Sequence, residues 1–194
     1  MNKQYSVVIL AGGKSTRMGF DKSTIDWNGK PLLLAIAEGF HDCDDLFLSV
    51  RDSFQKTPLH LPCVIDEIPG CGPLSGIVAA LHVCKNDYLF VTTCDAPFVT
   101  SETADILISH ITENTDAAVP LLNNGMVEPL CAIYRKNVMQ KAVKNLKDGK
   151  WKLYSLLASL KTIYVPAEEF PMREKTFTNL NTQEDIAQVL NKYH

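Results

Sequence analysis

Several features that mark other classes of protein are missing from this sequence. Its six cysteines form no C-x-x-C pair, and its five histidines are scattered along the chain. We therefore expect reduced thiols, most of them small core residues, and no structural zinc site. No histidine-centred arrangement accompanies any motif, which argues against acyl-transfer and hydrolytic mechanisms.

Long apolar runs and basic runs interleaved with aromatic residues are missing as well. No run is long enough to span a bilayer, and no hydrophobic signal region precedes the first predicted strand. We expect a cytoplasmic protein with no membrane partner. The net charge of −3, from 19 basic and 22 acidic residues, argues against a nucleic-acid partner.

The composition itself is that of an ordinary globular protein. Of the 194 residues, 46% are hydrophobic and 21% are charged, which predicts one domain over residues 1–194. Helical patterns alternate with apolar strand patterns at residues 5–9, 46–50, 62–66 and 87–95. This alternation predicts an α/β fold, a Rossmann-like three-layer α/β/α arrangement with a mainly parallel sheet. Residues 126–134 predict an antiparallel addition in the C-terminal half.

The most informative stretch is residues 10–22, which read L-A-G-G-K-S-T-R-M-G-F-D-K after the first strand pattern. Gly12 and Gly13 allow backbone N–H groups to approach an anion closely. An arginine fork and two ammonium groups suited to phosphate follow at Arg17, Lys14 and Lys22. The pattern predicts a phosphate-binding loop. The alternative, a glycine-rich turn with solvated cations, leaves the cluster of cations unexplained.

Two better-known phosphate motifs do not fit this stretch. A P-loop ending in Gly13-Lys14-Ser15 requires its first glycine at the position of Val8. A dinucleotide fingerprint requires G-x-G-x-x-G, and glycines at 12, 13 and 19 do not have that spacing.

Two further segments follow predicted strands. Residues 68–76, I-P-G-C-G-P-L-S-G, predict a loop whose backbone approaches a ligand, with a helix from Ile77; the alternative is an ordinary strand-to-helix connection. Asp95 ends the 87–95 strand, where ligands bind in open α/β sheets, and a carboxylate there suits Mg²⁺. The alternative for Asp95 is a cap before Pro97.

The C-terminal half contains fewer signals. A helix is expected from residues 100–102 to about Ile111, and others over 136–147 and 151–160. Lysines 141, 144, 147, 150 and 152 form a solvated face, although they could also steer a polyanion. Thr182 with Asp185 predicts a capping arrangement, which accounts for part of the segment around Asn179 and Asn181.

The stretch at 10–22 resembles the nucleotide-binding loop of nucleotidyltransferases built on the sugar-nucleotide transferase fold. L-A-G-G with D-K after R-M-G is most similar to the molybdenum cofactor guanylyltransferases. Further segments resemble motifs of the same family: G-P-L-S-G at 72–76, C-D-A-P-F at 94–98, E-P-L at 128–130 and N-L-N-T at 179–182. The chain departs from the family at Gln183, where proline is usual, and at Ser49, where asparagine is familiar.

The resemblance implies a role for each matching residue. Catalysis is expected from Arg17, Lys22 and Asp95, with Asp95 also binding Mg²⁺. Nucleotide contacts are expected from Leu10, Ala11, Gly12, Gly13, Lys22, Ser49, Asp66, Gly72, Pro73, Leu74 and Asp95. Asn179 and Asn181 are expected on the acceptor side.

The reaction implied by the resemblance is transfer of GMP from GTP to the terminal phosphate of molybdopterin. Its partners are then GTP, molybdopterin, and proteins that insert molybdenum or deliver the cofactor to molybdoenzymes. An ionised phosphate nucleophile needs no general base, which agrees with the lack of a histidine-centred site. Two alternatives stay open: a relative that uses CTP or a sugar phosphate, and a non-catalytic nucleotide-binding regulator.

Overall fold

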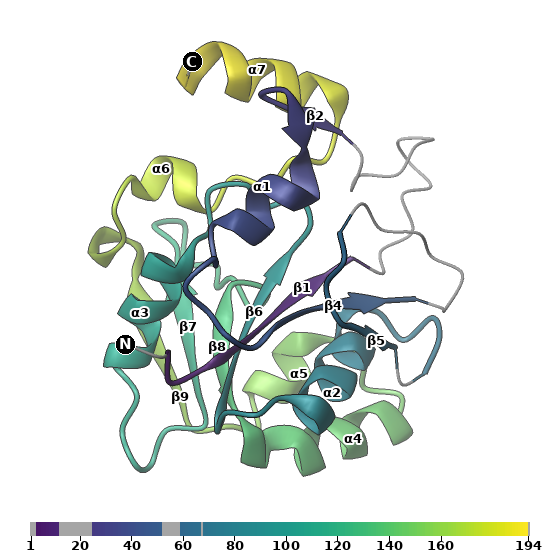
Figure 1. Cartoon of the computed structure of the whole chain (residues 1–194). Coiled ribbons are helices and arrows are strands. Elements are labelled where there is room, and N and C mark those ends of the chain that lie inside the picture. The colour runs from purple at the N-terminus through teal and green to yellow at the C-terminus, as the bar shows by residue number, and fades with distance from the viewer. Residues whose placement is uncertain (1–2, 12–24, 52–58, 67, 194) are drawn as a thin grey trace.

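The computed structural model describes residues 3–11, 25–51, 59–66 and 68–193 (Figure 1). Its main sheet has seven strands in the order β5-β4-β1-β6-β8-β7-β9. Their bounds are β1 Ser6–Leu10, β4 Leu46–Val50, β5 Cys63–Ile65, β6 Tyr88–Thr93, β7 Ala117–Leu121, β8 Ala132–Arg135 and β9 Thr162–Pro166. Only β8 runs against its neighbours in this sheet. The predicted mainly parallel sheet with an antiparallel addition is therefore confirmed.

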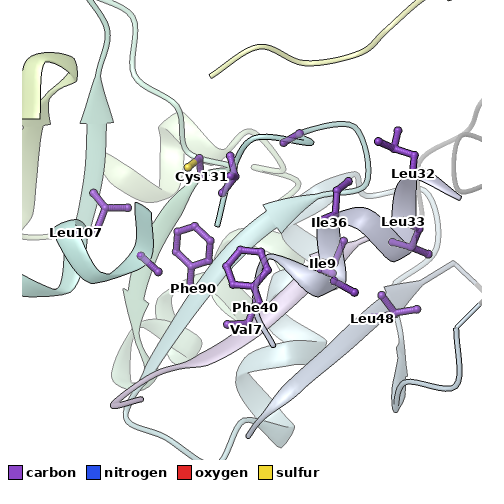
Figure 2. Packing of buried hydrophobic residues seen from close by; sticks show 14 of the residues in the cluster. Val7, Ile9, Leu32, Leu33, Ile36, Phe40, Leu48, Phe90, Leu107 and Cys131 are labelled. Atoms are coloured by element: carbon purple, nitrogen blue, oxygen red, sulfur yellow. The ribbon is translucent and has the colours of Figure 1, made fainter. Parts of the chain in front are cut away.

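The central strand β1 is buried on both faces because its side chains alternate between two hydrophobic clusters. Val7 and Ile9 join the first cluster, and Val8 and Leu10 join the second. The first cluster is drawn in Figure 2, where Phe40 packs beside a phenylalanine of β6, Phe90, at a centroid distance of 5.6 Å. A continuous β-branched run fits a parallel strand that is covered on both sides.

Helices cover both faces of the sheet, so the predicted three-layer arrangement is confirmed. The first cluster includes residues of α1 (Leu32–Glu38) and α3 (Ser101–Ser109). The second includes residues of α2 (Pro73–Val83), α4 (Met139–Lys147) and α5 (Leu153–Leu157). Within the described part of the chain, no helix is both long and apolar enough to cross a membrane.

Shorter elements complete the chain. A two-stranded hairpin of β2 (Asp26–Trp27) and β3 (Lys30–Pro31) turns at Asn28 and Gly29, with φ values of 54° and 80°. The C-terminal part contains two 3₁₀ turns and two further helices: η2 Lys136–Val138, η3 Ala167–Glu169, α6 Arg173–Thr176 and α7 Gln183–Tyr193.

Several predicted boundaries are wrong. Helix α2 begins at Pro73 rather than Ile77, because Gly72 adopts φ 71° just before it and proline suits the first helical position. Strand β8 begins only at Ala132 and helix α5 spans only five residues. Strand β9 was not predicted, and it pairs with β7 along its whole length.

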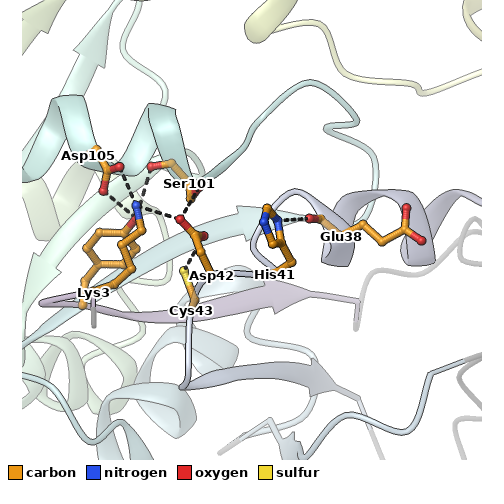
Figure 3. A network of polar contacts seen from close by, with 8 residues as sticks. Lys3, Glu38, His41, Asp42, Cys43, Ser101 and Asp105 are labelled. Carbon is orange, nitrogen blue, oxygen red and sulfur yellow. Dashed lines mark hydrogen bonds and ion pairs between the residues drawn. The ribbon is translucent and has the colours of Figure 1, made fainter. Parts of the chain in front are cut away.

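A polar network joins the N-terminus to the loop after α1 and to α3 (Figure 3). The ammonium of Lys3 lies 2.9 Å from Asp42 and 2.6 Å from Asp105. The Tyr5 hydroxyl donates to Asp105 at 2.9 Å, and Ser101 donates to Asp42 at 3.3 Å. Burial would raise the pKa of Asp42, but the hydrogen bonds from Lys3 and Ser101 hold it below its ordinary value. Burial opposes the charge on Lys3 too, yet its two carboxylate partners raise its pKa.

We expect Lys3→Met to lower the free energy of unfolding by at most about 1 kcal/mol at neutral pH, because both carboxylates are more than one third exposed. The lowered pKa of Asp42 contributes stability above the ordinary carboxyl pKa of about 3.9, and this is lost as the pH falls further. Urea unfolding at pH 7 and at the lowest pH where both proteins remain folded measures the difference. A loss that does not shrink in acid would contradict the assignment.

Candidate functional site

The carboxyl ends of four parallel strands meet at one edge of the sheet. Leu10 of β1 pairs with Ser49 of β4 and Thr93 of β6, and Ser49 pairs with Val64 of β5. Two backbone hydrogen bonds continue the ladder: Ala11 N–H donates to Ser49 at 2.8 Å, and Cys94 N–H donates to Leu10 at 3.2 Å. Ala11 and Cys94, the first residues after β1 and β6, therefore lie at the edge where open α/β sheets bind ligands.

The predicted residues Leu10 and Ala11 lie at the start of this edge. Their exposed fractions are only 9% and 7%, so their side chains belong to the core and only their backbone can face a ligand. The residues expected to follow them in the loop lie outside the described residues: Gly12, Gly13, Lys14, Arg17 and Lys22.

At the ends of β4 and β5, Ser49 and Asp66 form a pair. The Ser49 hydroxyl donates to Asp66 Oδ1 at 2.8 Å and is 1% exposed, whereas Asp66 is half-buried. Burial raises the pKa of Asp66, and the Ser49 hydrogen bond and the charge of Arg51 oppose the rise. A carboxylate that the fold disfavours in its charged form, at the edge where ligands bind, is typical of a functional group.

Helix α2 covers this pair through Gly76. A Cβ atom on Gly76 would lie 2.3 Å from Ser49 Oγ and 3.1 Å from both Asp66 Oδ1 and Leu10 Cδ2. Only glycine at position 76 therefore lets α2 pack this closely against the pair. One residue earlier, Ser75 Oγ accepts a hydrogen bond from Ile68 N–H at 2.7 Å, which ties the preceding loop to the helix.

Gly72, Pro73 and Leu74, the other predicted residues of this loop, differ in which of their atoms a ligand can reach. Gly72 and Pro73 are exposed, and Gly72 precedes the first turn of α2 with φ 71°. The Leu74 side chain is fully buried in the second cluster, so it anchors the helix and leaves only its backbone for a ligand.

Asp95 lies two residues beyond β6, at the same edge as Ala11. The Thr93 hydroxyl donates to Asp95 Oδ1 at 2.6 Å, which orients the carboxylate. The backbone of Asp95 accepts a hydrogen bond from Leu180 N–H at 2.8 Å, and the Leu180 side chain is fully buried. The structure thus brings Asn179 and Asn181, one residue on either side of Leu180, next to Asp95.

The predicted capping arrangement after these asparagines is confirmed. Asp185 Oδ2 accepts hydrogen bonds from the N–H groups of Asn181 and Thr182, both at 2.8 Å. Asp185 N–H donates to the Thr182 hydroxyl at 3.0 Å. The cap uses the backbone N–H of Asn181.

A second carboxylate near Asp95 is that of Glu128, which begins the E-P-L segment that resembles a family motif. Glu128 lies in the segment before β8, where its N–H donates to the carbonyl of Pro120 in β7 at 3.1 Å, and its carboxylate lies close enough to Asp95 for the two charges to interact. Burial raises the pKa of Glu128, and the charge of Asp95 raises it further, while the Leu130 N–H opposes the rise. The signal in the sequence that points to this residue is the E-P-L resemblance at 128–130.

An aromatic contact also ties distant segments to the loop after Asp95. The Lys175 ammonium lies 4.3 Å from the ring centroid of Phe98, and Trp27 of the hairpin meets the same ring edge-on at 5.6 Å. These residues were not predicted, because cation–π pairs carry no spacing rule along the chain.

Comparison with known proteins agrees with this geometry. The family model described as "MobA-like NTP transferase domain" matches residues 7–163. The chain belongs to the MobA-like NTP transferase family. The resemblance noted at residues 10–22 is thereby confirmed at the level of the family.

The relatives of this MobA-like NTP transferase match along almost the whole chain. A probable molybdenum cofactor guanylyltransferase of Carboxydothermus hydrogenoformans is 33% identical, over 95% of this chain and 94% of the relative. A protein of the same name from Bacillus cereus is 31% identical over 95% of each chain.

Solved structures show the same fold. Molybdopterin-guanine dinucleotide biosynthesis protein A from Archaeoglobus fulgidus has a TM-score of 0.83 at 26% identity, over 99% of this chain and all of that one. The 2-C-methyl-D-erythritol 4-phosphate cytidylyltransferase of Thermus thermophilus has a TM-score of 0.67 at 16% identity, over 98% of each chain, and shares the fold alone.

We expect Gly76→Ala to destabilise the MobA-like chain by about 1–3 kcal/mol, because the new methyl group overlaps Ser49 Oγ. At an unobstructed helical site the same change stabilises by about 0.5–1 kcal/mol, so the sign of the effect is diagnostic. Urea unfolding measures it. In a Ser49→Ala background, which lacks the overlapping oxygen, the loss should be smaller; an equal loss would show that Ser49 is not the obstruction.

Proposed function

We propose that the chain transfers GMP from GTP to molybdenum-loaded molybdopterin. The acceptor group is the terminal phosphate of that molecule. A phosphate oxygen of molybdopterin forms a bond to the α-phosphorus of GTP. The bond from that phosphorus to the oxygen bridging to the β-phosphate breaks, and pyrophosphate leaves with the electron pair. The products are molybdopterin guanine dinucleotide and pyrophosphate. The names of the relatives support this choice of substrates.

The observation that carries the proposal is the joining of three separate segments at one edge of the sheet. Cys94 N–H bonds to Leu10, and Leu180 N–H bonds to Asp95, so the start of the loop, the Asp95 turn and the C-terminal segment lie together. A nucleotide held by the first segment and an acceptor held by the last would then meet beside Asp95. Such positioning supplies much of the rate in phosphoryl-type transfers.

The residues at this edge fit Mg²⁺. Asp95 and the nearby Glu128 offer hard oxygen ligands, and two neighbouring carboxylates favour a bound cation. Among the described residues there is no group of three or more His, Cys, Asp or Glu side chains that could hold a metal. This agrees with Mg²⁺, which is normally held by one or two carboxylates with substrate phosphates and water. When bound, the ion neutralises charge on the phosphates.

The remaining roles follow the family resemblance. Leu10, Ala11 and the glycines after them hold the nucleotide through backbone groups. Arg17 and Lys22 neutralise the triphosphate and the departing pyrophosphate. Asp66 and the segment from Gly72 to Leu74 hold the nucleoside, and Asn179 and Asn181 face the acceptor.

Two other functions are tested by the same assays. The fold is shared with a cytidylyltransferase, so CTP or another phosphate acceptor is the nearest alternative. A regulator that binds nucleotide without turnover is the other, and it would release no pyrophosphate when acceptor is present.

We expect Asp95→Asn to lower kcat at least about 10²-fold, because charge stabilisation at the reacting phosphates is lost. Lys22→Ala should have an effect of similar size. The measurement is guanylation of purified molybdenum–molybdopterin with Mg²⁺ and radiolabelled GTP, followed as dinucleotide and pyrophosphate.

Asp87→Asn is the matched control, because Asp87 is exposed and lies at the opposite end of the same strand. It should retain wild-type turnover. Near-full activity in Asp95→Asn would remove that residue from the mechanism, and a preference for CTP over GTP would replace the proposed substrate.

A further inference from the structure

We propose that Ser49 is a positioning residue, which acts on the nucleotide only through the carboxylate of Asp66. This inference rests on the proposed function, since it concerns how that nucleotide site is built. It differs from the direct contact that the family resemblance implies for position 49, and it follows from three features of the described residues.

The first feature is that the Ser49 hydroxyl is closed off from a ligand. Ser49 is 1% exposed, and helix α2 passes so close that a Cβ atom on Gly76 would lie 2.3 Å from its oxygen. No ligand atom can occupy that space while α2 stays in place, because even a methyl group does not fit there.

The second feature is the hydrogen bond that the hydroxyl makes. Ser49 Oγ donates to Asp66 Oδ1 at 2.8 Å, and no other donor from the described residues reaches the Asp66 side chain. The bond from Ser49 uses Oδ1, so Oδ2 is the oxygen that we assign to a donor of the ligand. A carboxylate held by a hydroxyl on one oxygen presents the other in a fixed direction, which lowers the ordering cost of binding.

The third feature is the position of Asp66 at the ligand-binding edge. Its backbone N–H donates to Val50 at 3.0 Å, which extends the β4–β5 ladder by one residue. Asp66 is half-buried, so it is open to a ligand that Ser49 cannot reach. A carboxylate accepts hydrogen bonds only, so the ligand group must be an N–H or O–H donor of the nucleoside.

The chain contains a matched control at the other end of the sheet. Ser6 of β1 is fully buried, and its hydroxyl lowers the pKa of a nearby carboxylate, that of Asp45, which precedes β4. Its hydroxyl accepts a hydrogen bond from Asn86 N–H at 3.1 Å. Ser6→Ala removes a buried serine with the same kind of partner, far from the carboxyl ends of the strands.

The experiment is calorimetric titration of GTP into wild type, Ser49→Ala, Asp66→Ala and the double variant, with Ser6→Ala as control. We expect Ser49→Ala to weaken GTP binding about tenfold, which corresponds to one hydrogen bond to a charged group. We also expect kcat at saturating GTP to stay within about twofold. Ser6→Ala should bind GTP as wild type does, even if its thermal stability falls by as much as that of Ser49→Ala.

The double variant separates positioning from direct contact. If Ser49 acts through Asp66, Ser49→Ala should have no further effect on GTP binding once Asp66 is alanine. The proposal is overturned if Ser49→Ala binds GTP like wild type, or if its loss persists unchanged in the Asp66→Ala background. It is also overturned if Ser6→Ala weakens GTP binding as much as Ser49→Ala does. The loss of affinity would then follow from lower stability of the fold and not from the Asp66 carboxylate. If wild type binds neither GTP nor CTP, the proposed function is wrong and the inference falls with it.

Discussion

The parallel hydrogen-bond ladder through β1 is the constraint on which the rest of the structure depends. Because β4 and β6 flank β1 in the same direction, their carboxyl ends are set at one edge, and the backbone bonds at Ala11 and Cys94 extend the alignment past the strands. Side chains of β1 are buried on both faces, so a shift of one residue would exchange its two hydrophobic clusters. The packing that fixes the register therefore also fixes the position of the site.

Two fully buried serines lie at opposite ends of the ladder, Ser6 at the amino end and Ser49 at the carboxyl end, and each has a hydrogen-bond partner. At the amino end, Ser6 and Asp45 join β1 to β4, and burial there is offset enough to leave the pKa of Asp45 below its ordinary value. At the carboxyl end the balance is reversed, and burial leaves the pKa of Asp66 raised. The first pair strengthens the folded state at neutral pH, and the second weakens it. Such a destabilising buried carboxylate is typical of a functional site, where it can bind a ligand.

Contacts that close the site come from segments distant in the chain. The C-terminal stretch reaches Asp95 through the Leu180 backbone and the loop after it through the Lys175–Phe98 contact, and the segment before β8 brings Glu128 near Asp95. These contacts each cross more than 30 positions of sequence, so they depend on the order of strands in the sheet. The same fold in a cytidylyltransferase shows that this frame alone does not select a base.

The sequence by itself determined the α/β class, most strands, the family and the candidate residues at the strand ends. It did so because burial patterns and glycine, proline and cation spacing are local properties. Only the tertiary structure decided that β9 exists, that Ser49 is sealed beneath Gly76, and that Glu128 lies near Asp95. Each of these depends on pairing or close packing between segments far apart, and residue spacing along one segment does not encode the distance to another.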